Sequence, residues 1–182
     1  MADFETSYSV VNRVLIIEDE ADERDRLRDL LEKDGLTVET VKDGGQSRGA
    51  FNMNKPDLVL LDLILPNESG YEVCEWIKEQ DETVPVVIHS AISLEDSVKL
   101  AERVGADAYL VKPADDGDIL TTIRNTAEEV WRRNHLDGPS DSGGKVRFEC
   151  THCHSKIKVL AKHRGHQLSC PKCGTRVVVP RA

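Results

Sequence analysis

The sequence has no long hydrophobic run, no export signal and only five cysteines among 182 residues. A membrane-spanning helix needs about 20 consecutive apolar residues, a length that no stretch approaches. The N-terminal segment MADFETSYSV is polar and acidic, unlike a secretory signal peptide. We therefore expect a cytoplasmic protein without membrane insertion, in which thiols stay reduced. Its cysteines are then expected to be metal ligands or buried small side chains.

Charge divides the chain into two chemically different parts. Residues 1–144 carry 15 basic and 32 acidic side chains, a net charge of −17, whereas residues 145–182 carry nine basic and one acidic, a net charge of +8. At the junction, the segment LDGPSDSGG has the composition of a linker. The sequence thus predicts a larger domain at 12–135, a flexible linker at 136–144 and a small domain at 145–182.

Short apolar runs alternate with helical patterns through the larger domain. Leu27, Leu30 and Leu31 form one stripe of the first helical pattern, and Ile119 and Ile123 begin the stripe of the last. The expected strands are residues 14–17, 37–41, 58–61, 86–88 and 108–111. This alternation predicts an α/β fold with a five-stranded, parallel, doubly wound (flavodoxin-like) sheet that carries helices on both faces.

Polar side chains follow these strands at the point where each strand ends. Glu18 and Asp19 follow the first strand, and Asp62 follows the third. Ser90 and Lys112 stand at the ends of the fourth and fifth. Because the carboxyl ends of parallel strands meet at one edge of a sheet, these five side chains are expected to converge. Clustered carboxylates repel one another unless a cation intervenes, which predicts a Mg2+ site and a carboxylate nucleophile toward phosphorus.

The segments VLIIEDE, LVLLDLILPNESG, VVIHSA and YLVKP resemble the receiver domain of bacterial two-component response regulators, over roughly residues 13–131. The resemblance implies that Asp62 accepts a phosphoryl group from a sensor histidine kinase or a phosphotransfer protein. It also implies a Mg2+ site, with Asp19 as a direct ligand and Glu18 as its water-mediated neighbour. The backbone carbonyl of Ile64 would complete the metal shell.

The same resemblance assigns roles to three further side chains. Ser90 would hydrogen-bond one phosphoryl oxygen, and Lys112 would pair with another. Tyr109 matches the switch aromatic residue, which turns inward when the hydroxyl is drawn to the phosphate. The Lys112–Pro113 bond is cis in relatives, a geometry that is cheap only before proline.

Two apolar residues bear on the lifetime of the phosphorylated form. In the family, the positions two residues beyond the acceptor and two beyond the hydroxyl gate the access of water to the acyl phosphate. Ile64 and Ile92 occupy these positions. We expect this pair to exclude water and to make the phosphorylated form long-lived.

Two alternatives to a phosphorylation switch stay open. A phosphohydrolase with an aspartyl intermediate would want a second aspartate two residues past the nucleophile, where Ile64 stands. In a constitutive adaptor, phosphorylation would be incidental. The favoured expectation is a phosphoacceptor regulatory protein of a phosphorelay, which is an enzyme only toward its own phosphotransfer and dephosphorylation.

The small domain has four cysteines at the spacing of a zinc ribbon. Cys150-x-x-Cys153 and Cys170-x-x-Cys173 are separated by 16 residues, which fits a zinc site with four cysteine ligands. Zn2+ would supply stability that so small a piece cannot obtain from burial alone. A rival exists, because Cys150-Thr-His-Cys153-His154 also fits the haem-attachment pattern. Haem attachment would leave the second pair unexplained, so zinc is favoured.

The small domain is expected to bind a downstream partner. Its nine basic side chains suit contacts with phosphates, and hence nucleic acid. Phe148 is its only aromatic residue, so it offers no platform for base stacking. A protein-docking module with a solvated basic surface is supported at least as well. Neither a helix-turn-helix pattern nor a catalytic motif follows the larger domain.

Overall fold

The computed structural model describes residues 11–135, 145–160 and 163–180. Val11–Ala127 form one compact unit, and the described residues from Glu128 onward belong to a second. The predicted linker at 136–144 lies outside the described residues, so the predicted domain boundaries stay a prediction. No helix in the described part of the chain is long and apolar enough to cross a membrane.

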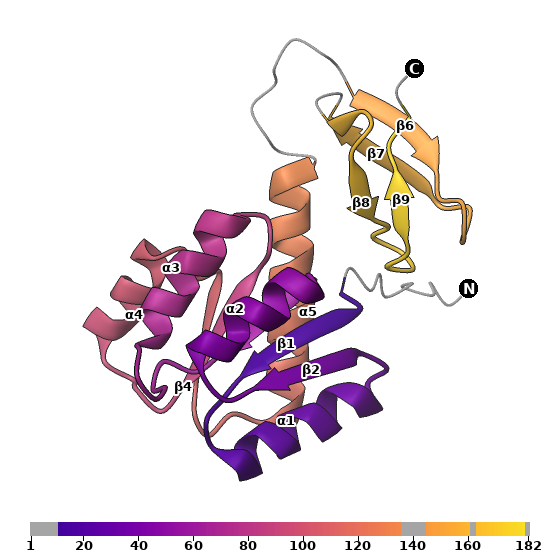
Figure 1. Cartoon of the computed structure of the whole chain (residues 1–182). Coiled ribbons are helices and arrows are strands. Elements are labelled where there is room, and N and C mark those ends of the chain that lie inside the picture. Colours follow the sequence, from indigo (N-terminus) through magenta and orange to yellow (C-terminus); the bar gives the residue numbers. More distant parts are fainter. Residues whose placement is uncertain (1–10, 136–144, 161–162, 181–182) are drawn as a thin grey trace. The chain divides into compact units, whose positions relative to one another are not determined.

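The first unit alternates strands and helices in the predicted order (Figure 1). Its strands are β1 (Arg13–Ile17), β2 (Thr37–Val41), β3 (Leu58–Leu61), β4 (Val86–Ser90) and β5 (Ala108–Val111). Its helices are α1 (Ala21–Lys33), α2 (Gly44–Met53), α3 (Gly70–Gln80), α4 (Glu95–Arg103) and α5 (Asp116–His135), the last of which extends into the second unit. The strands are all parallel, in the order β2-β1-β3-β4-β5, which confirms the predicted fold.

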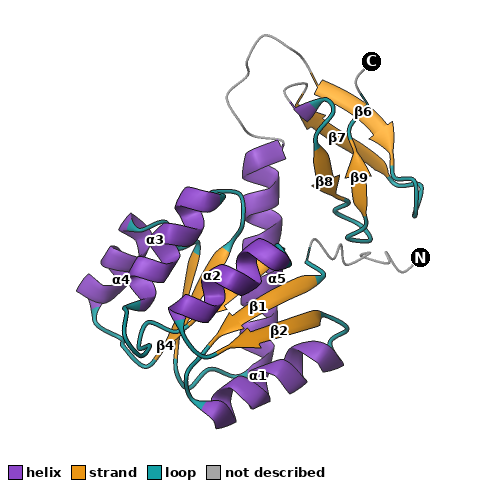
Figure 2. Ribbon diagram, in the orientation of Figure 1, coloured by secondary structure: helices purple, strands orange, loops and turns teal. Residues whose placement is uncertain are grey.

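Helices bury both faces of this sheet (Figure 2). Leu15 and Ile17 of β1 belong to the same buried cluster as Phe51 of α2 and Ile77 of α3. Neighbouring side chains of a strand point to opposite faces, so Ile16, which is also fully buried, faces the other layer. Burial on both faces explains the unbroken apolar runs of β1, β3 and β4. The packed sheet holds the carboxyl ends of its strands at one edge.

The second unit contains two antiparallel hairpins. One is formed by β6 (Lys145–Glu149) and β7 (Lys156–Leu160), the other by β8 (Gln167–Ser169) and β9 (Arg176–Val178). Seven buried residues form the core of this unit: Val146, Cys150, Ile157, Val159, Cys170, Val177 and Val179. Trp131, near the end of α5, packs against this core and donates its Nε1–H to the Ser169 carbonyl at 3.2 Å.

Candidate functional site

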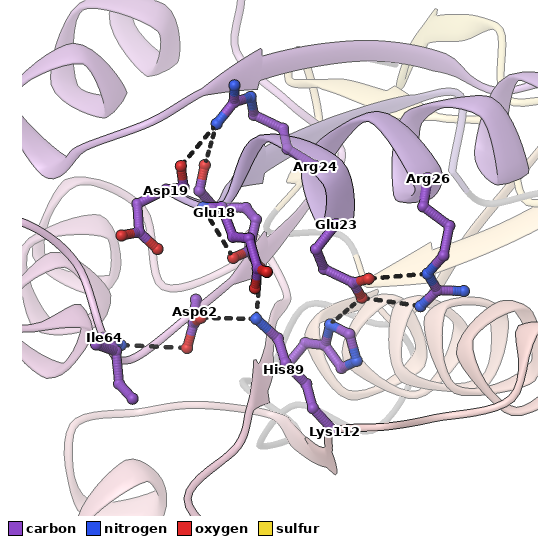
Figure 3. A network of polar contacts seen from close by, with 10 residues as sticks. Glu18, Asp19, Glu23, Arg24, Arg26, Asp62, Ile64, His89 and Lys112 are labelled. Carbon is purple, nitrogen blue, oxygen red and sulfur yellow. Dashed lines mark hydrogen bonds and ion pairs between the residues drawn. The ribbon is translucent and has the colours of Figure 1, made fainter.

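Side chains from the carboxyl ends of three strands meet at one edge of the sheet (Figure 3). Carboxylate oxygens of Glu18 and Asp19, after β1, and of Asp62, after β3, lie within 4.8 Å of one another, and we call these residues the acidic triad. Lys112, after β5, donates from Nζ to Glu18 Oε2 and to Asp62 Oδ2, both at 2.7 Å. The structure therefore brings together four of the residues that were expected to converge.

Burial and charge oppose each other at this edge. Glu18 and Asp62 are only 2% and 6% exposed, whereas Asp19 is exposed. Burial raises the pKa of Glu18 to about 7, against the lowering effect of Lys112. Burial also disfavours the charge of Lys112, but its bonds to Asp62 and Glu18 prevail and raise its pKa. The lysine thus holds two carboxylates that would otherwise repel each other, and all three acids offer the oxygen ligands that Mg2+ prefers.

Three hydrogen bonds that sequence reasoning missed, each with a backbone group, hold the acidic triad in place. The Arg24 Nη1 donates to the carbonyl oxygens of Glu18 and Asp19, at 2.9 and 3.1 Å (Figure 3). The Ile64 N–H donates to Asp62 Oδ1 at 3.1 Å. Together these bonds fix the turn after β1 and the orientation of the Asp62 carboxylate.

The start of α3 packs directly on the Asp62 loop. The Gly70 N–H donates to the Leu63 carbonyl at 2.9 Å. A Cβ at Gly70 would lie 2.2 Å from the Asp62 carbonyl oxygen, so only glycine permits this approach. Ser69 and Glu72 form a capping box that starts the helix at this point. That capping pattern is the sequence feature that would have located the contact.

The predicted hydroxyl and switch residues lie on β4 and β5. Ser90 is fully buried, and its Oγ has no hydrogen-bond partner among the described residues. A buried polar atom without a partner costs free energy, so this position suits a ligand oxygen that accepts a hydrogen bond. The Tyr109 hydroxyl donates to the Ile92 carbonyl at 2.6 Å, and its ring packs against the core, so it points toward the loop after β4. The Lys112–Pro113 bond is cis, as the resemblance implies.

The four C-terminal cysteines converge into one cluster. Their sulfurs all lie within 4.8 Å of one another, and the Cys150–Cys173 and Cys153–Cys170 sulfur pairs are 3.6 and 3.7 Å apart. None of them forms a disulfide. Four thiolates at about 2.3 Å from a tetrahedral zinc ion lie roughly 3.8 Å apart, so the spacing fits zinc. Convergence also gives the second pair a role that haem attachment does not.

The two halves of the cluster share a turn geometry. His154 and Gly174, each directly after the second cysteine of its pair, both have left-handed backbones, with φ of 57° and 66°. The Ser155 hydroxyl, 3.1 Å from the Cys153 sulfur, lowers the pKa of that thiol to about 6. This contact favours the thiolate, which is the form that binds metals.

Comparison with known proteins matches the first unit to one family. Residues 14–124 match the response regulator receiver domain. The chain is 31% identical over 150 residues to the alkaline phosphatase synthesis transcriptional regulatory protein SphR of Synechococcus elongatus, covering 78% of this chain and 56% of that protein. It is 37% identical over 128 residues to the transcriptional regulatory protein CseB of Streptomyces avermitilis, covering 70% and 52%. The chain thus spans little more than half the length of these relatives.

Solved structures share the fold. The CheY-like receiver domain protein from Methanospirillum hungatei has a TM-score of 0.65 at 24% identity, over 68% of this chain and 98% of that one. A two-component response regulator from Clostridium difficile has a TM-score of 0.62 at 26% identity, over 64% and 96%. The acidic triad is typical of the Mg2+ site of receiver domains, and the cysteine cluster is consistent with a zinc ribbon. The chain therefore belongs to the response regulator receiver family of two-component signalling, with a small four-cysteine β region that follows the receiver domain.

Proposed function

We propose that this protein is a phosphorylation-controlled response regulator, in which Asp62 accepts a phosphoryl group and the four-cysteine region is a zinc-ribbon output. The donor would be the phosphohistidine of a sensor histidine kinase or of a phosphotransfer protein. One observation carries the proposal: the buried Asp62 carboxylate lies 2.7 Å from the Lys112 ammonium and belongs to the acidic triad. A carboxylate beside a fixed cation and a set of metal ligands suits attack on phosphorus.

The side chains of the site have distinct tasks in this transfer. The Asp62 carboxylate oxygen forms a bond to phosphorus as the bond from phosphorus to the donor nitrogen breaks, and the nitrogen keeps the electron pair. The Lys112 ammonium offsets charge on one phosphoryl oxygen, and the Ser90 hydroxyl donates a hydrogen bond to another. Bound Mg2+, held by the acidic triad and the Ile64 carbonyl, supplies further neutralisation of phosphoryl charge.

The loop after β4 offers a route from phosphorylation to output. Ser90 directly precedes this loop, and the Ile92 carbonyl within it accepts the hydrogen bond of Tyr109. Movement of the Ser90 hydroxyl toward the phosphate would displace the start of the loop and alter the bond between Tyr109 and Ile92. A downstream partner would then select between two packings of β4 and β5, which is a population shift.

The test is covalent labelling with acetyl phosphate and Mg2+, followed by intact-protein mass spectrometry. The wild-type protein is expected to gain the mass of one HPO3 group, and Asp62→Asn is expected to gain none. Asp96→Asn, which changes an exposed carboxylate of α4, is the matched control and keeps the adduct. Steady release of phosphate from the donor would instead indicate a phosphohydrolase. No adduct at all would indicate a constitutive adaptor.

The Ile64→Asn substitution is expected to shorten the lifetime of the phosphorylated protein. Ile64 is 55% exposed, two residues past Asp62, and Ile92 packs partly buried against the core. An amide at residue 64 would hold water near the acyl phosphate, which the apolar side chain keeps away. Decay of the adduct is measured by mass spectrometry after removal of the donor. A Met53→Asn control, at an 82% exposed position, leaves the lifetime unchanged, and an unaltered lifetime in Ile64→Asn would contradict the gate.

We also propose that the cysteine cluster holds one structural Zn2+. The ligands would be the thiolates of Cys150, Cys153, Cys170 and Cys173. All four sulfurs are taken up by the ion, so the site has no open position for catalysis, in keeping with a regulatory protein rather than an enzyme. Reduced thiols require a reducing compartment, which makes the cytoplasm the proposed location. The folded ribbon would then bind a protein or a nucleic acid.

A further inference from the structure

The β6–β7 hairpin has one buried apolar face and one exposed face rich in charge. Val146, Ile157 and Val159 are buried, and Phe148 packs partly buried beside them. Side chains alternate along a strand, so the intervening residues point the other way. These intervening residues are all exposed and all charged: Arg147, Glu149, Lys156 and Lys158.

The strand register places two cations directly opposite each other on the exposed face. Arg147 pairs with Lys158, and Glu149 pairs with Lys156. Like charges directly across an antiparallel pair destabilise it, so the Arg147–Lys158 pair is not explained by the stability of the hairpin. Within residues 145–160 and 163–180, neither of these two side chains has an ion-pair partner.

Several cations of the first unit, some exposed and some half-buried, lie in ion pairs. Arg26 is paired with Asp116, and Lys99 is paired with Glu95. In contrast, the sequence offers only Glu149 as an acidic residue between 145 and 182. The β6–β7 face therefore carries uncompensated positive charge, which favours a partner that brings its own negative charge.

Two features of the face select the kind of anion. Between residues 146 and 159, where the burial of its side chains is described, the face has no exposed apolar or aromatic residue, and a protein interface depends on such residues as buried anchors. It equally lacks a stacking platform for the bases of a single strand. A rigid two-stranded ribbon of the hairpin's width does fit the major groove of B-form DNA. On the basis of the proposed zinc-folded ribbon, we infer that the exposed face of β6 and β7 binds the phosphate backbone of duplex DNA. Arg147, Lys156 and Lys158 make the contacts, and these contacts do not read the base sequence.

The experiment is fluorescence anisotropy of a short, mixed-sequence DNA duplex titrated with full-length, zinc-loaded protein over a range of salt concentrations. The logarithm of the binding constant is expected to fall linearly with the logarithm of salt concentration. The Arg147→Gln/Lys158→Gln double variant is expected to reduce that slope by roughly 1.8, about 0.9 for each phosphate that the protein no longer neutralises. At roughly 50 mM salt its affinity should fall by about two orders of magnitude.

Two control variants test whether DNA binding depends on where the cations stand or only on the net charge of the protein. Arg28→Gln/Lys99→Gln removes the same charge from ion-paired residues of α1 and α4, one half-buried and one exposed, and it should leave the slope unchanged. Arg147→Lys/Lys158→Arg keeps the cations and should retain binding. An equal loss of affinity in the Arg28/Lys99 variant would overturn the inference, because it would show that only net charge matters.

Competitors and parallel measurements complete the test. Displacement of the duplex by polyglutamate at matched charge would overturn the inference and favour an acidic protein partner. Tighter binding of single-stranded DNA than of the duplex would also overturn it, and would favour contacts with the bases. Zinc content and the Asp62 adduct are measured on the same sample. Absence of DNA binding in a protein that holds zinc and takes up phosphate would overturn this inference alone and leave the proposed function standing.

Discussion

Removal of the proposed zinc ion with a chelator is expected to unfold the β6–β9 region and to leave the receiver sheet folded. The buried core of this region consists of five valine or isoleucine side chains and two cysteines, too little apolar surface for independent stability. Structural zinc contributes about 10 to 16 kcal/mol of apparent binding free energy in comparable small domains, and that free energy disappears with the ion. The receiver core contains no proposed zinc ligand, so its unfolding transition should stay in place.

The two tryptophans of the chain report on the two units separately. Trp131 packs against the core of the cysteine region, and Trp76 lies edge-on to Phe51 in the receiver, with ring centroids 5.6 Å apart. In a Trp76→Phe variant, chelation should shift the emission of Trp131 to longer wavelength. In a Trp131→Phe variant, the emission of Trp76 should not change.

Cysteine substitutions provide a matched pair for the same measurement. Cys150→Ser removes one proposed ligand, and it should abolish zinc binding and reproduce the effect of the chelator. Cys74→Ala alters a free cysteine buried in α3, and it should keep one zinc ion per chain. An unchanged Trp131 emission after chelation would show that the region folds without metal.

The receiver fold and most of its acidic site follow from local patterns in the sequence. Glu18, Asp19, Asp62 and Lys112 each stand directly after an apolar run, so the parallel topology alone determines that they meet. Arg24 could not be predicted, because it is one of several cations along an exposed helix. Only the folded turn shows that its guanidinium reaches two backbone carbonyls.

The cysteine region likewise has features that the sequence predicts and a contact that it does not. The spacing of the cysteines predicts a metal ribbon, because this feature is local in the sequence. Trp131 is half-buried. Its partner, the Ser169 carbonyl, is 38 residues away in the sequence, and no periodicity links the two.

The Lys112→Met substitution is expected to lower the free energy of unfolding of the metal-free protein by about 3 to 5 kcal/mol near pH 8. Methionine fills a similar volume but leaves Glu18 and Asp62, both nearly fully buried, facing each other without a cation. Removing one member of a buried ion pair costs more than the pair itself contributes, because the remaining charges stay desolvated. Lys99→Met, which breaks an exposed pair with Glu95, should cost less than about 1 kcal/mol.

The cost of Lys112→Met should shrink as the pH falls toward 5. The pKa of Glu18 is raised by burial to about 7 from 4.5, even with Lys112 lowering it. A carboxyl group with a raised pKa in the folded state contributes stability below its unfolded pKa and loses it as the pH rises through the folded one. Without the lysine the pKa of Glu18 rises further, so near pH 5 Glu18 is neutral and no longer repels Asp62.

Urea unfolding at about pH 5 and about pH 8, with and without Mg2+, checks this prediction. Millimolar Mg2+ should restore part of the missing stability near pH 8, because the ion supplies positive charge to the same carboxylates. An equal cost at both pH values would show that Lys112 does not neutralise Glu18. A cost that Mg2+ leaves unchanged near pH 8 would show that the acidic triad does not bind the ion. The lysine and the proposed Mg2+ would therefore act on the same charge imbalance, and phosphorylation of Asp62 would add negative charge at the same place, which both cations would offset.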